Sequence, residues 1–404
     1  MNKPSFTVIG ISDAPKPWLP PEVIEEISHG HVFSGGKRHH EIMCDYMPPQ
    51  ARWIDITVPL DAVFNQYRTV FAEENQSIIV FASGDPLFFG FANTIRREMP
   101  DAAIRLYPAF NSLQTLAHRM ILPYHDMRIV SLTGRPWHEF DRALIEQCGK
   151  MGVLTDHEHT PAAIAQRMLD YGFDDYDMTV GEHLGNPLLE KVTRLTLREA
   201  AGYVATHPNN LILTRPSDAP NRRKWGIPDS DFALLDGRER MITKMPIRLL
   251  SLQAMELHRK QVMWDVGFCT GSVSIEAKLQ FPHLEVVSFE IRNEGERLMN
   301  ENTKRFHAPG IKPIIGDFLT ADISQLPVPD TVFIGGHGGK LREIVAKLVA
   351  VMPRGGCIVM NAVSEQSRKL FEAAVQEQGL VAQTPLHIVL NDYNPIDILK
   401  AIKP

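Results

Sequence analysis

The residues best suited to bind a ligand surround a glycine-containing turn in the second half of the chain. An apolar run at 262–266 is followed by Gly267 and Gly271, and a helical pattern begins near Ser272. A residue without a Cβ atom lets the backbone approach a ligand closely, and the first N–H groups of the new helix point toward it. This order predicts the start of a nucleotide-cofactor site. Two glycines also occur in buried strand-to-helix turns that bind nothing, so the assignment depends on the residues that follow.

Two carboxylates follow at the ends of predicted strands. The apolar run at 285–291 contains Glu290 about twenty positions after the turn, where an acidic side chain can accept both ribose hydroxyls. A third run ends at Asp317, and a fourth leads into a glycine loop at 335–339. The pattern at 340–352 follows the i, i+3, i+4, i+7 rule of a helix. Alternating strands and helices predict a parallel α/β sheet with ligands at the carboxyl ends of its strands.

The first half of the chain carries another sharp turn. The run at 77–82 predicts a strand, Ser83-Gly84-Asp85-Pro86 follows it, and a helix is expected after the proline. Proline and glycine together fix a turn that exposes backbone amide and carbonyl groups. The same turn could merely cap a helix, so its interpretation depends on other motifs in this half.

Length and composition indicate a two-domain globular protein. The chain has 404 residues, more than one domain usually contains, and we expect domains at 1–215 and 237–404 with a linker at 216–236. Hydrophobic residues make up 44% and charged residues 22%, which suffices for sizeable cores. A net charge of −6 gives no general footprint for nucleic acid. No apolar run approaches the roughly eighteen residues that a membrane-spanning helix needs.

The cysteines and histidines do not suggest a metal site. None of the four cysteines, Cys44, Cys148, Cys269 and Cys357, belongs to a CxxC spacing, and we expect reduced thiols in a cytoplasmic protein. The densest histidine groups are His39-His40 and 157–159, and neither has the i, i+4 spacing of helical metal ligands. Ordinary surface or loop histidines are therefore favoured.

The spacing of the C-terminal turn separates two kinds of nucleotide site. A dinucleotide site has GxGxxG, whereas this turn resembles motif I (DxGxGxG) of the class I S-adenosylmethionine-dependent methyltransferases, with Asp265, Gly267 and Gly271 in register. Cys269 replaces the middle glycine, so either φ stays negative there or the loop leaves its usual path. With MITK at 241–244, FIGGHGG and PRGGCIVMNAV, the chain from Gly226 onward resembles the carbon-15 methylating and decarboxylating enzymes of cobalamin biosynthesis.

That resemblance implies a Rossmann-like class I methyltransferase domain at the C-terminus. The implied cofactor contacts are Thr243, Asp265, Gly267, Gly271, Ser272, Glu290, Asp317 and Gly335.

The motifs of the first half resemble the tetrapyrrole methylase superfamily, and within it the carbon-5 methyltransferases of the same pathway. They are, in order, GGKRH, ASGDPLFFG, PAFNSL, SLTGRP, VLTDHEHTPAAIA and GEHLGNPLLE. In that family S-adenosylmethionine lies in a trough between two α/β subdomains and is held mostly by backbone groups. The implied contacts are Gly84, Asp85, Pro86, Asn111, Ser112, Asp156, Thr160 and Ala162. The loop at 10–15 has less glycine than the first loop of the family.

Together the halves resemble a fused methyltransferase of cobalamin biosynthesis with one S-adenosylmethionine in each domain. The resemblance implies methylation of carbons 5 and 15 of a precorrin-6-type tetrapyrrole and decarboxylation of its ring C acetate, which gives a precorrin-8-type product. Methyl transfer from a sulfonium depends mainly on alignment, so a nucleophilic side chain is unnecessary. An acidic group that protonates or hydrogen-bonds the ring system would help.

The carboxylates of such a substrate predict cations at the mouth of each cleft. Arg38 and Arg135 are the candidates in the first half, and Lys244 and Arg248 in the second. His337 could orient a substrate carboxylate or relay a proton. We take Arg38 and His337 as the candidate catalytic residues, and we expect a tetrapyrrole partner, no nucleic acid, no membrane and a homo-oligomer.

Two other classes of function stay open. Relatives of both folds methylate RNA or protein, although the chain has neither a basic patch nor an appended RNA module. A scaffold in which one domain has lost cofactor binding is the other alternative, and Cys269 in the glycine motif supports it.

Overall fold

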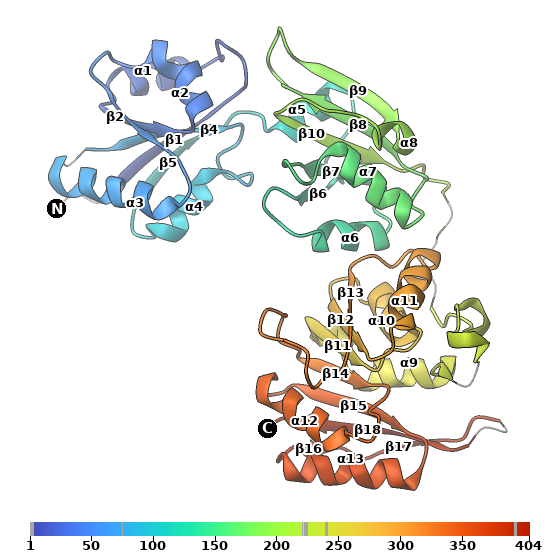
Figure 1. The fold of residues 1–404 in the computed structure, drawn as a ribbon. Helices are drawn as coiled ribbons and strands as arrows, with labels where there is room; N and C mark the ends of the chain where they lie inside the picture. The colour runs from blue at the N-terminus through green and yellow to red at the C-terminus, as the bar shows by residue number, and fades with distance from the viewer. Residues whose placement is uncertain (1–3, 75, 220, 222–224, 239–240, 392–393) are drawn as a thin grey trace. The chain divides into compact units, whose positions relative to one another are not determined.

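The computed structural model describes residues 4–74, 76–219, 221, 225–238, 241–391 and 394–404. Contacts divide the chain into two compact units, composed of residues 1–135, 149–166 and 176–215, and of residues 136–148, 167–175 and 216–404. Strands and helices alternate through most of each unit (Figure 1), so the predicted α/β class is confirmed. Within the described ranges no helix is long and apolar enough to cross a membrane.

The first sheet is parallel and has helices on both faces (Figure 1). In spatial order its strands are β3 (Arg52–Asp55), β2 (Val32–Gly35), β4 (Ile78–Ser83), β1 (Ser5–Ile11) and β5 (Ala103–Tyr107). Its helices are α1 (Pro21–Ser28), α2 (Lys37–Met43), α3 (Leu60–Thr69) and α4 (Phe91–Glu98). Phe6 and Val8 of β1 pack with α3 and α4, whereas Ile9 and Ile11 pack with α1 and α2. Burial on both faces explains why these strands have nearly continuous apolar sequences.

The turn after β4 differs from the expectation in where the next helix begins. α4 starts at Phe91 rather than directly after Pro86. The Asp85 carboxylate accepts the N–H of Leu87 at 2.8 Å, and Phe89 has a left-handed φ of 53°. This local side-chain bond favours a turn over a helix and delays the helix start.

The second sheet is mixed. In spatial order its strands are β6 (Arg128–Ser131), β7 (Lys150–Leu154), β10 (Asn209–Thr214), β8 (Asp177–Glu182) and β9 (Lys191–Thr196). The helices in this part of the sequence are α5 (Ser112–Arg119), α6 (His138–Ile145), α7 (Pro161–Asp170) and α8 (Leu197–Ala200). β10 runs antiparallel to both of its neighbours, β7 and β8. α5 packs through Leu113 and Leu116 on Ile212 of β10.

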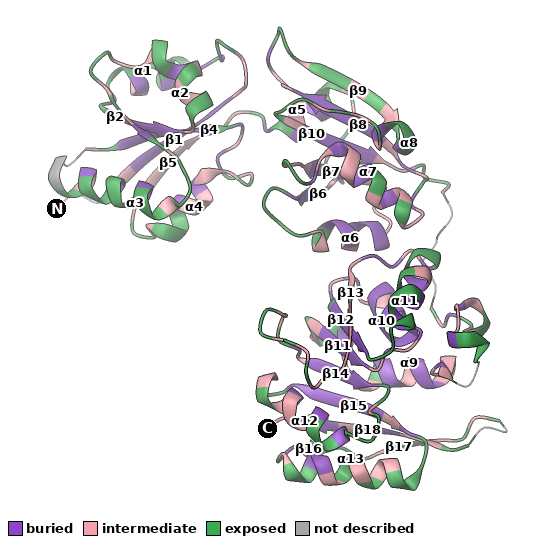
Figure 2. Ribbon diagram, viewed as in Figure 1, coloured by how far each residue is buried: buried purple, intermediate pink, exposed green. Residues whose placement is uncertain are grey.

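The third sheet, in the second unit, has five parallel strands and an antiparallel edge among the residues that the structure describes. Its spatial order is β13 (Ile311–Ile315), β12 (Glu285–Glu290), β11 (Val262–Val266), β14 (Thr331–Ile334), β15 (Cys357–Ala362), β18 (Ile396–Ile402) and β16 (Val381–Ala382), with β17 (Leu386–Ile388) also paired to β18. Its helices are α9 (Met245–Ala254), α10 (Ser272–Gln280), α11 (Glu294–Arg305), α12 (Leu341–Val351) and α13 (Glu365–Glu377). Trp264 and Val266 face α12 and α13, whereas Met263 faces α9 and α10. Figure 2 shows the central strands buried between helices with exposed outer faces.

The order of this sheet reverses at β11. β12 pairs with one edge of β11, and β14 pairs with the other. The connection after β11 therefore leads to one side of the sheet, toward β12, whereas the connection after β14 leads to the other side, toward β15. Open α/β sheets bind ligands in the crevice at the carboxyl ends of such a strand pair.

The later part of the expected linker is packed against the second unit. Ile227 and Phe232 are buried in a cluster with Phe268 and Ile275. Isolated apolar residues among polar ones lack the periodicity that sequence patterns detect, so their burial was not predicted.

Candidate active sites

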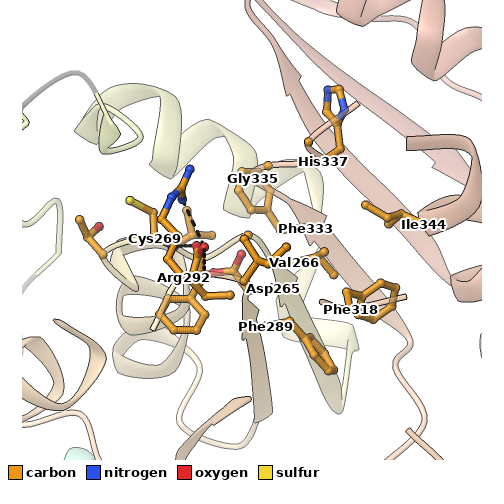
Figure 3. A pocket seen from close by; sticks show the side chains of 18 of the residues that line it. Asp265, Val266, Cys269, Phe289, Arg292, Phe318, Phe333, Gly335, His337 and Ile344 are labelled. Carbon is orange, nitrogen blue, oxygen red and sulfur yellow. Dashed lines mark hydrogen bonds and ion pairs between the residues drawn. The ribbon is translucent and has the colours of Figure 1, made fainter. Parts of the chain in front are cut away.

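A cavity of about 290 Å³ opens at the carboxyl ends of β11, β12 and β14 (Figure 3). Its lining contains most of the residues predicted for this domain, namely Thr243, Asp265, Gly267, Ser272, Glu290, Asp317, Gly335 and His337. Gly271 is absent from the lining and precedes α10 with a left-handed φ of 77°. The topology thus brings residues from distant parts of the sequence to one place.

The glycine turn lies directly against the loop after β14. A Cβ atom on Gly267 would lie 2.6 Å from the backbone N of Gly336, and one on Gly335 would lie 2.8 Å from the carbonyl O of Gly267. Side chains at these positions would collide with backbone that cannot move easily, so glycine is required by the approach of the two loops.

Cys269 adopts the left-handed backbone expected of the glycine that it replaces. Its φ is 51°, so of the two sequence alternatives a negative φ is excluded. Glu290 Oε2 accepts the N–H of Cys269 at 2.8 Å, and Glu290 Oε1 accepts the N–H of Arg292 at 3.1 Å and its Nη1 at 3.2 Å. Burial, reinforced by the charge of Glu290, raises the pKa of the Cys269 thiol to about 11. The thiol is therefore protonated near neutral pH.

Asp265 is fully buried beneath the turn. Ser274 Oγ donates to Oδ2 of Asp265 at 2.6 Å, whereas the buried Oδ1 has no hydrogen-bond partner. Burial raises the pKa of Asp265 to about 7. The hydrogen bond from Ser274 lowers this pKa, and the negative charge of Glu290 raises it. An unpartnered buried oxygen in a cavity lining can be satisfied by a donor on a ligand.

His337, in the loop after β14, also lines this cavity. The N–H of Gly339 donates to Nδ1 of His337 at 3.2 Å, so the neutral ring holds its proton on Nε2. Burial lowers the pKa of His337, which favours this neutral form. Figure 3 shows His337 and Ile344 across the cavity from Arg292. His337 therefore contributes a neutral ring with an Nε2–H donor to the cavity lining.

Asp317 and Lys340 form an ion pair in the same lining. Lys340 Nζ donates to Oδ2 of Asp317 at 2.9 Å, and the N–H of Leu319 donates to Oδ1 at 2.9 Å. The Lys340 hydrogen bond, followed by that of Leu319, lowers the pKa of Asp317. Asp317 is therefore ionised where it was predicted to meet the cofactor.

Arg248 does not lie at a cavity mouth, and the prediction that it binds substrate carboxylates is wrong. Its side chain is fully buried, with Nε donating to Glu276 Oε2 at 3.0 Å and Nη1 donating to the carbonyl O of Thr243 at 2.9 Å and to Asp229 Oδ1 at 3.2 Å. Glu276 also accepts the N–H of Gly226 at 2.7 Å. The pair fixes the segment that carries Thr243 to the cavity, so Arg248 is a positioning residue.

A second cavity, of about 660 Å³, lies in the first unit, where the ends of β1 and β4 meet α5, β7 and β10. Arg38, Gly84, Asn111, Ser112 and Arg135 line it, as predicted residues of this domain. Beside it, β1 and the turn after β4 approach each other closely, because a Cβ atom on Gly10 of β1 would lie 1.8 Å from the carbonyl O of Gly84.

Arg38 belongs to a polar cluster at the end of β4. Its Nε lies 3.1 Å from Asp13 Oδ1, and its Nη2 donates to Ser83 Oγ at 3.3 Å. His39 Nδ1 accepts the N–H of Gly36 at 3.3 Å, so the neutral ring donates through Nε2 to Ser83 Oγ at 2.9 Å. Burial and the charge of Arg38 lower the pKa of His39 to about 4, which keeps the ring neutral. Two donors into Ser83 Oγ direct the serine hydrogen toward another acceptor, such as a ligand.

Several predicted residues of this domain do not line the cavity. They are Asp85, Pro86, Asp156, Thr160 and Ala162. Asp156 Oδ1 accepts the N–H groups of Glu158 at 2.9 Å and His159 at 2.7 Å, and its Oδ2 accepts that of Gly134 at 2.9 Å. Burial opposes ionisation, but these bonds lower the pKa of Asp156 to about 2. Contact of these residues with a cofactor stays a prediction.

Comparisons with known proteins assign different families to the two parts of the chain. A family profile described as tetrapyrrole (corrin/porphyrin) methylases matches residues 7–201, and one described as precorrin methyltransferase domain matches residues 236–399. A cobalt-precorrin-6B C(15)-methyltransferase (decarboxylating) of Salmonella typhimurium is 33% identical over 43% of this chain and 89% of its own length. A precorrin-6Y C(5,15)-methyltransferase (decarboxylating) of a Sinorhizobium species is 29% identical over 89% of this chain and 85% of its own.

The chain belongs to the precorrin-6Y C(5,15)-methyltransferase (decarboxylating) family. It is therefore an S-adenosylmethionine-dependent C-methyltransferase. A cobalt-precorrin-7 C(5)-methyltransferase of Salmonella typhimurium is also similar, at 26% identity over 44% of this chain and 85% of its own length.

Polar residues of these cavities that were not predicted as site residues include Arg292, Lys340 and Asn210. Arg292 and Lys340 follow the ends of β12 and β14, and basic residues after strand ends on the edge that carries Glu290 were an available signal. Asn210 lines the larger cavity but sits in an apolar strand, which gives no such signal. Among the described residues no cluster of three or more histidine, cysteine, aspartate or glutamate side chains could hold a metal ion.

Proposed function

We propose that this protein methylates carbon 5 of a precorrin-6-type tetrapyrrole with residues 1–215, and methylates carbon 15 and decarboxylates the ring C acetate with residues 237–404. The product would be a precorrin-8-type tetrapyrrole. Support comes from two separate cavities, whose lining residues fall within 11–210 and 241–344 and thus in parts of the chain similar to different methylases. Each cavity would hold one S-adenosylmethionine.

The C-terminal cavity suits a nucleoside cofactor on physical grounds. The unpartnered Oδ1 of Asp265 is a group that a polar ligand can satisfy, and Gly267 lines the same cavity. Glu290 would accept the ribose hydroxyls, in addition to its bond with Cys269. S-adenosylmethionine, when bound, supplies a methyl group that its sulfonium already activates. The main task of the protein is then to align the acceptor carbon.

The cations and donors around each cavity suit a substrate with many carboxylates. In the first domain Arg38, Arg135 and the Ser83 hydroxyl lie in one lining. In the second, His337 offers a neutral Nε2–H that can hydrogen-bond a substrate carboxylate or a ring nitrogen. A donor to the ring system makes the conjugated imine a better acceptor for the electron pair that loss of carbon dioxide leaves behind. A homo-oligomer and a cytoplasmic location stay predictions from the sequence.

The stoichiometry of S-adenosylmethionine binding to the full chain tests the two-site proposal. Gly267→Ala would place a Cβ atom 2.6 Å from Gly336 N, and Gly84→Ala would place one 2.8 Å from the Cα of Asn111, so each variant should disable one cavity. Gly379→Ala is the control, because Gly379 also has a positive φ but a Cβ atom there would meet no other atom within 4 Å. We expect two bound molecules for the natural chain and the control, and one for each cavity variant. A single molecule bound by the natural chain would favour a scaffold with one inactive domain.

A further inference from the structure

Asn210 is a buried amide without partners in the lining of the larger cavity. Its side chain is 1% exposed, and neither Nδ2 nor Oδ1 has a hydrogen-bond partner. A carboxamide offers two N–H donors and an acceptor oxygen, and buried polar side-chain atoms are nearly always paired. The neighbouring Asn209 shows the usual state, because its Oδ1 accepts from Thr155 Oγ1 at 2.7 Å and its Nδ2 donates to the carbonyl O of Thr206 at 2.9 Å. An amide left unpaired beside a cavity indicates a polar ligand.

Apolar side chains surround Asn210 in that cavity. Asn210 lies on β10 between Leu154 of β7 and Gly181 of β8 in register. Ile212, two residues along the strand and thus on the same face, packs with α5 in a cluster that includes Leu154 and Leu184. Leu154, Leu184 and Pro208 line the cavity beside the amide. A flat, largely apolar group with one polar edge matches this combination.

The two unpaired atoms of Asn210 restrict the ligand group further. A carboxylate has no donor for the amide oxygen, and a sulfonium has neither a donor nor an acceptor. Adenine offers a donor and an acceptor side by side, at the 6-amino group and an adjacent ring nitrogen, and asparagine pairs with such an edge through two hydrogen bonds. We propose that Asn210 binds the adenine of S-adenosylmethionine in the N-terminal cavity and makes this site specific for the 6-amino group. This inference rests on the proposed function of that cavity.

A base-specific binding measurement on the full chain tests the proposal. The Gly267→Ala background leaves only the N-terminal cavity competent, and S-adenosylhomocysteine serves as a stable probe for calorimetric titration. A second probe has unsubstituted purine in place of adenine. It lacks the 6-amino group, so it would leave the amide oxygen of Asn210 unpaired. We expect the purine analogue to bind at least about tenfold more weakly, which corresponds to roughly 1.4 kcal/mol. Asn210→Leu should weaken binding of the adenine probe about tenfold and abolish the preference for adenine over purine.

Three outcomes are distinguishable. Unchanged affinity of Asn210→Leu for both probes, with a higher melting temperature, would overturn the proposal, because removal of an unpaired buried amide alone stabilises the fold. A lasting preference for adenine in Asn210→Leu would overturn it as well. Failure of the Gly267→Ala chain itself to bind either probe would contradict the proposed function of the cavity instead. Asn210→Ala makes the same test if leucine does not fit, and Asn210→Leu in a Gly84→Ala chain should leave binding at the C-terminal cavity unchanged.

Discussion

The carboxylate of Glu290 accepts the backbone N–H of Cys269 at 2.8 Å and so joins the end of β12 to the middle of the glycine turn. Cys269 has a φ of 51°, a conformation that costs a non-glycine residue roughly 1–2 kcal/mol. A hydrogen bond to a charged group contributes about 1.5–3 kcal/mol and can offset that cost. Because Glu290 is also the predicted ribose acceptor, one side chain links the shape of the turn to cofactor binding.

Replacement of Glu290 by glutamine should weaken cofactor binding at the C-terminal cavity. The amide keeps an acceptor oxygen but loses the charge, so we expect the affinity for S-adenosylmethionine to fall about tenfold or more. Calorimetric titration in the Gly84→Ala chain measures this site alone, and exposed Glu285 on the same strand supplies the control Glu285→Gln. A lower melting temperature with unchanged affinity would mean that Glu290 serves only the turn.

Asp85→Ala should impair methylation at carbon 5 and spare carbon 15. The variant removes the 2.8 Å hydrogen bond from the N–H of Leu87, so the turn that holds Gly84 at the cavity should loosen. We expect the rate at carbon 5 to fall about tenfold, the size of effect that the loss of one hydrogen bond of about 1.4 kcal/mol produces. Product analysis by mass spectrometry separates the two positions, with the exposed Asp101→Ala as control. Equal losses at both carbons would contradict separate sites.

Arg248→Met should destabilise the second unit rather than reduce substrate affinity directly. Arg248 and Glu276 are both fully buried, and removal of one partner leaves the other charge uncompensated. We expect the free energy of unfolding to fall by about 3–5 kcal/mol, and Glu276→Gln in the same chain should restore part of it. Urea unfolding measures both effects. A loss below about 1 kcal/mol would show that the pair does not hold this segment.

Asp265 should make stability depend on pH. Its pKa is raised to about 7 in the folded chain, from about 3.9 when unfolded. Between these values the unfolded chain loses a proton that the folded chain keeps, so this contribution to stability is full below about pH 4 and is lost as pH rises to about 7. Asp265→Asn removes that dependence, and its melting temperature relative to the natural chain should rise from pH 5 to pH 7. A constant difference across this range would contradict a neutral buried carboxyl.

The sequence patterns predicted the strands and helices of the C-terminal sheet well because β11, β12 and β14 are buried on both faces and so have mostly apolar sequences. The glycine turn was predicted from a close approach of the backbone to a ligand, and the structure shows in addition that Gly267 and Gly335 lie where two loops meet. These features depend on local sequence or on backbone geometry, and both can be recognised from the amino-acid sequence alone.

The side-chain pairings were not predictable in the same way. In the sequence, Arg248 cannot be distinguished from a basic residue at the mouth of a site. Only the structure shows that it is buried and donates to Glu276 on the next helix. The sequence does not show which groups hydrogen-bond the side chain of Asn210. That neither polar atom of its amide has a partner is visible only in the structure. Cys269, with its positive φ, donates its backbone N–H to Glu290, and this hydrogen bond joins residues that follow or end two different strands. Such features arise from tertiary contacts, which neither residue of a pair indicates alone.

The most direct test of two methylations and one decarboxylation on this chain is a product count. The full chain is incubated with a precorrin-6-type tetrapyrrole and methyl-labelled S-adenosylmethionine, and labelled methyl groups and carbon dioxide are counted for each product molecule. We predict two methyl groups, at carbons 5 and 15, and one carbon dioxide. The Gly84→Ala chain should give one methyl group, at carbon 15, with carbon dioxide still released. A single methyl group from the natural chain, or two methyl groups without carbon dioxide, would contradict the account.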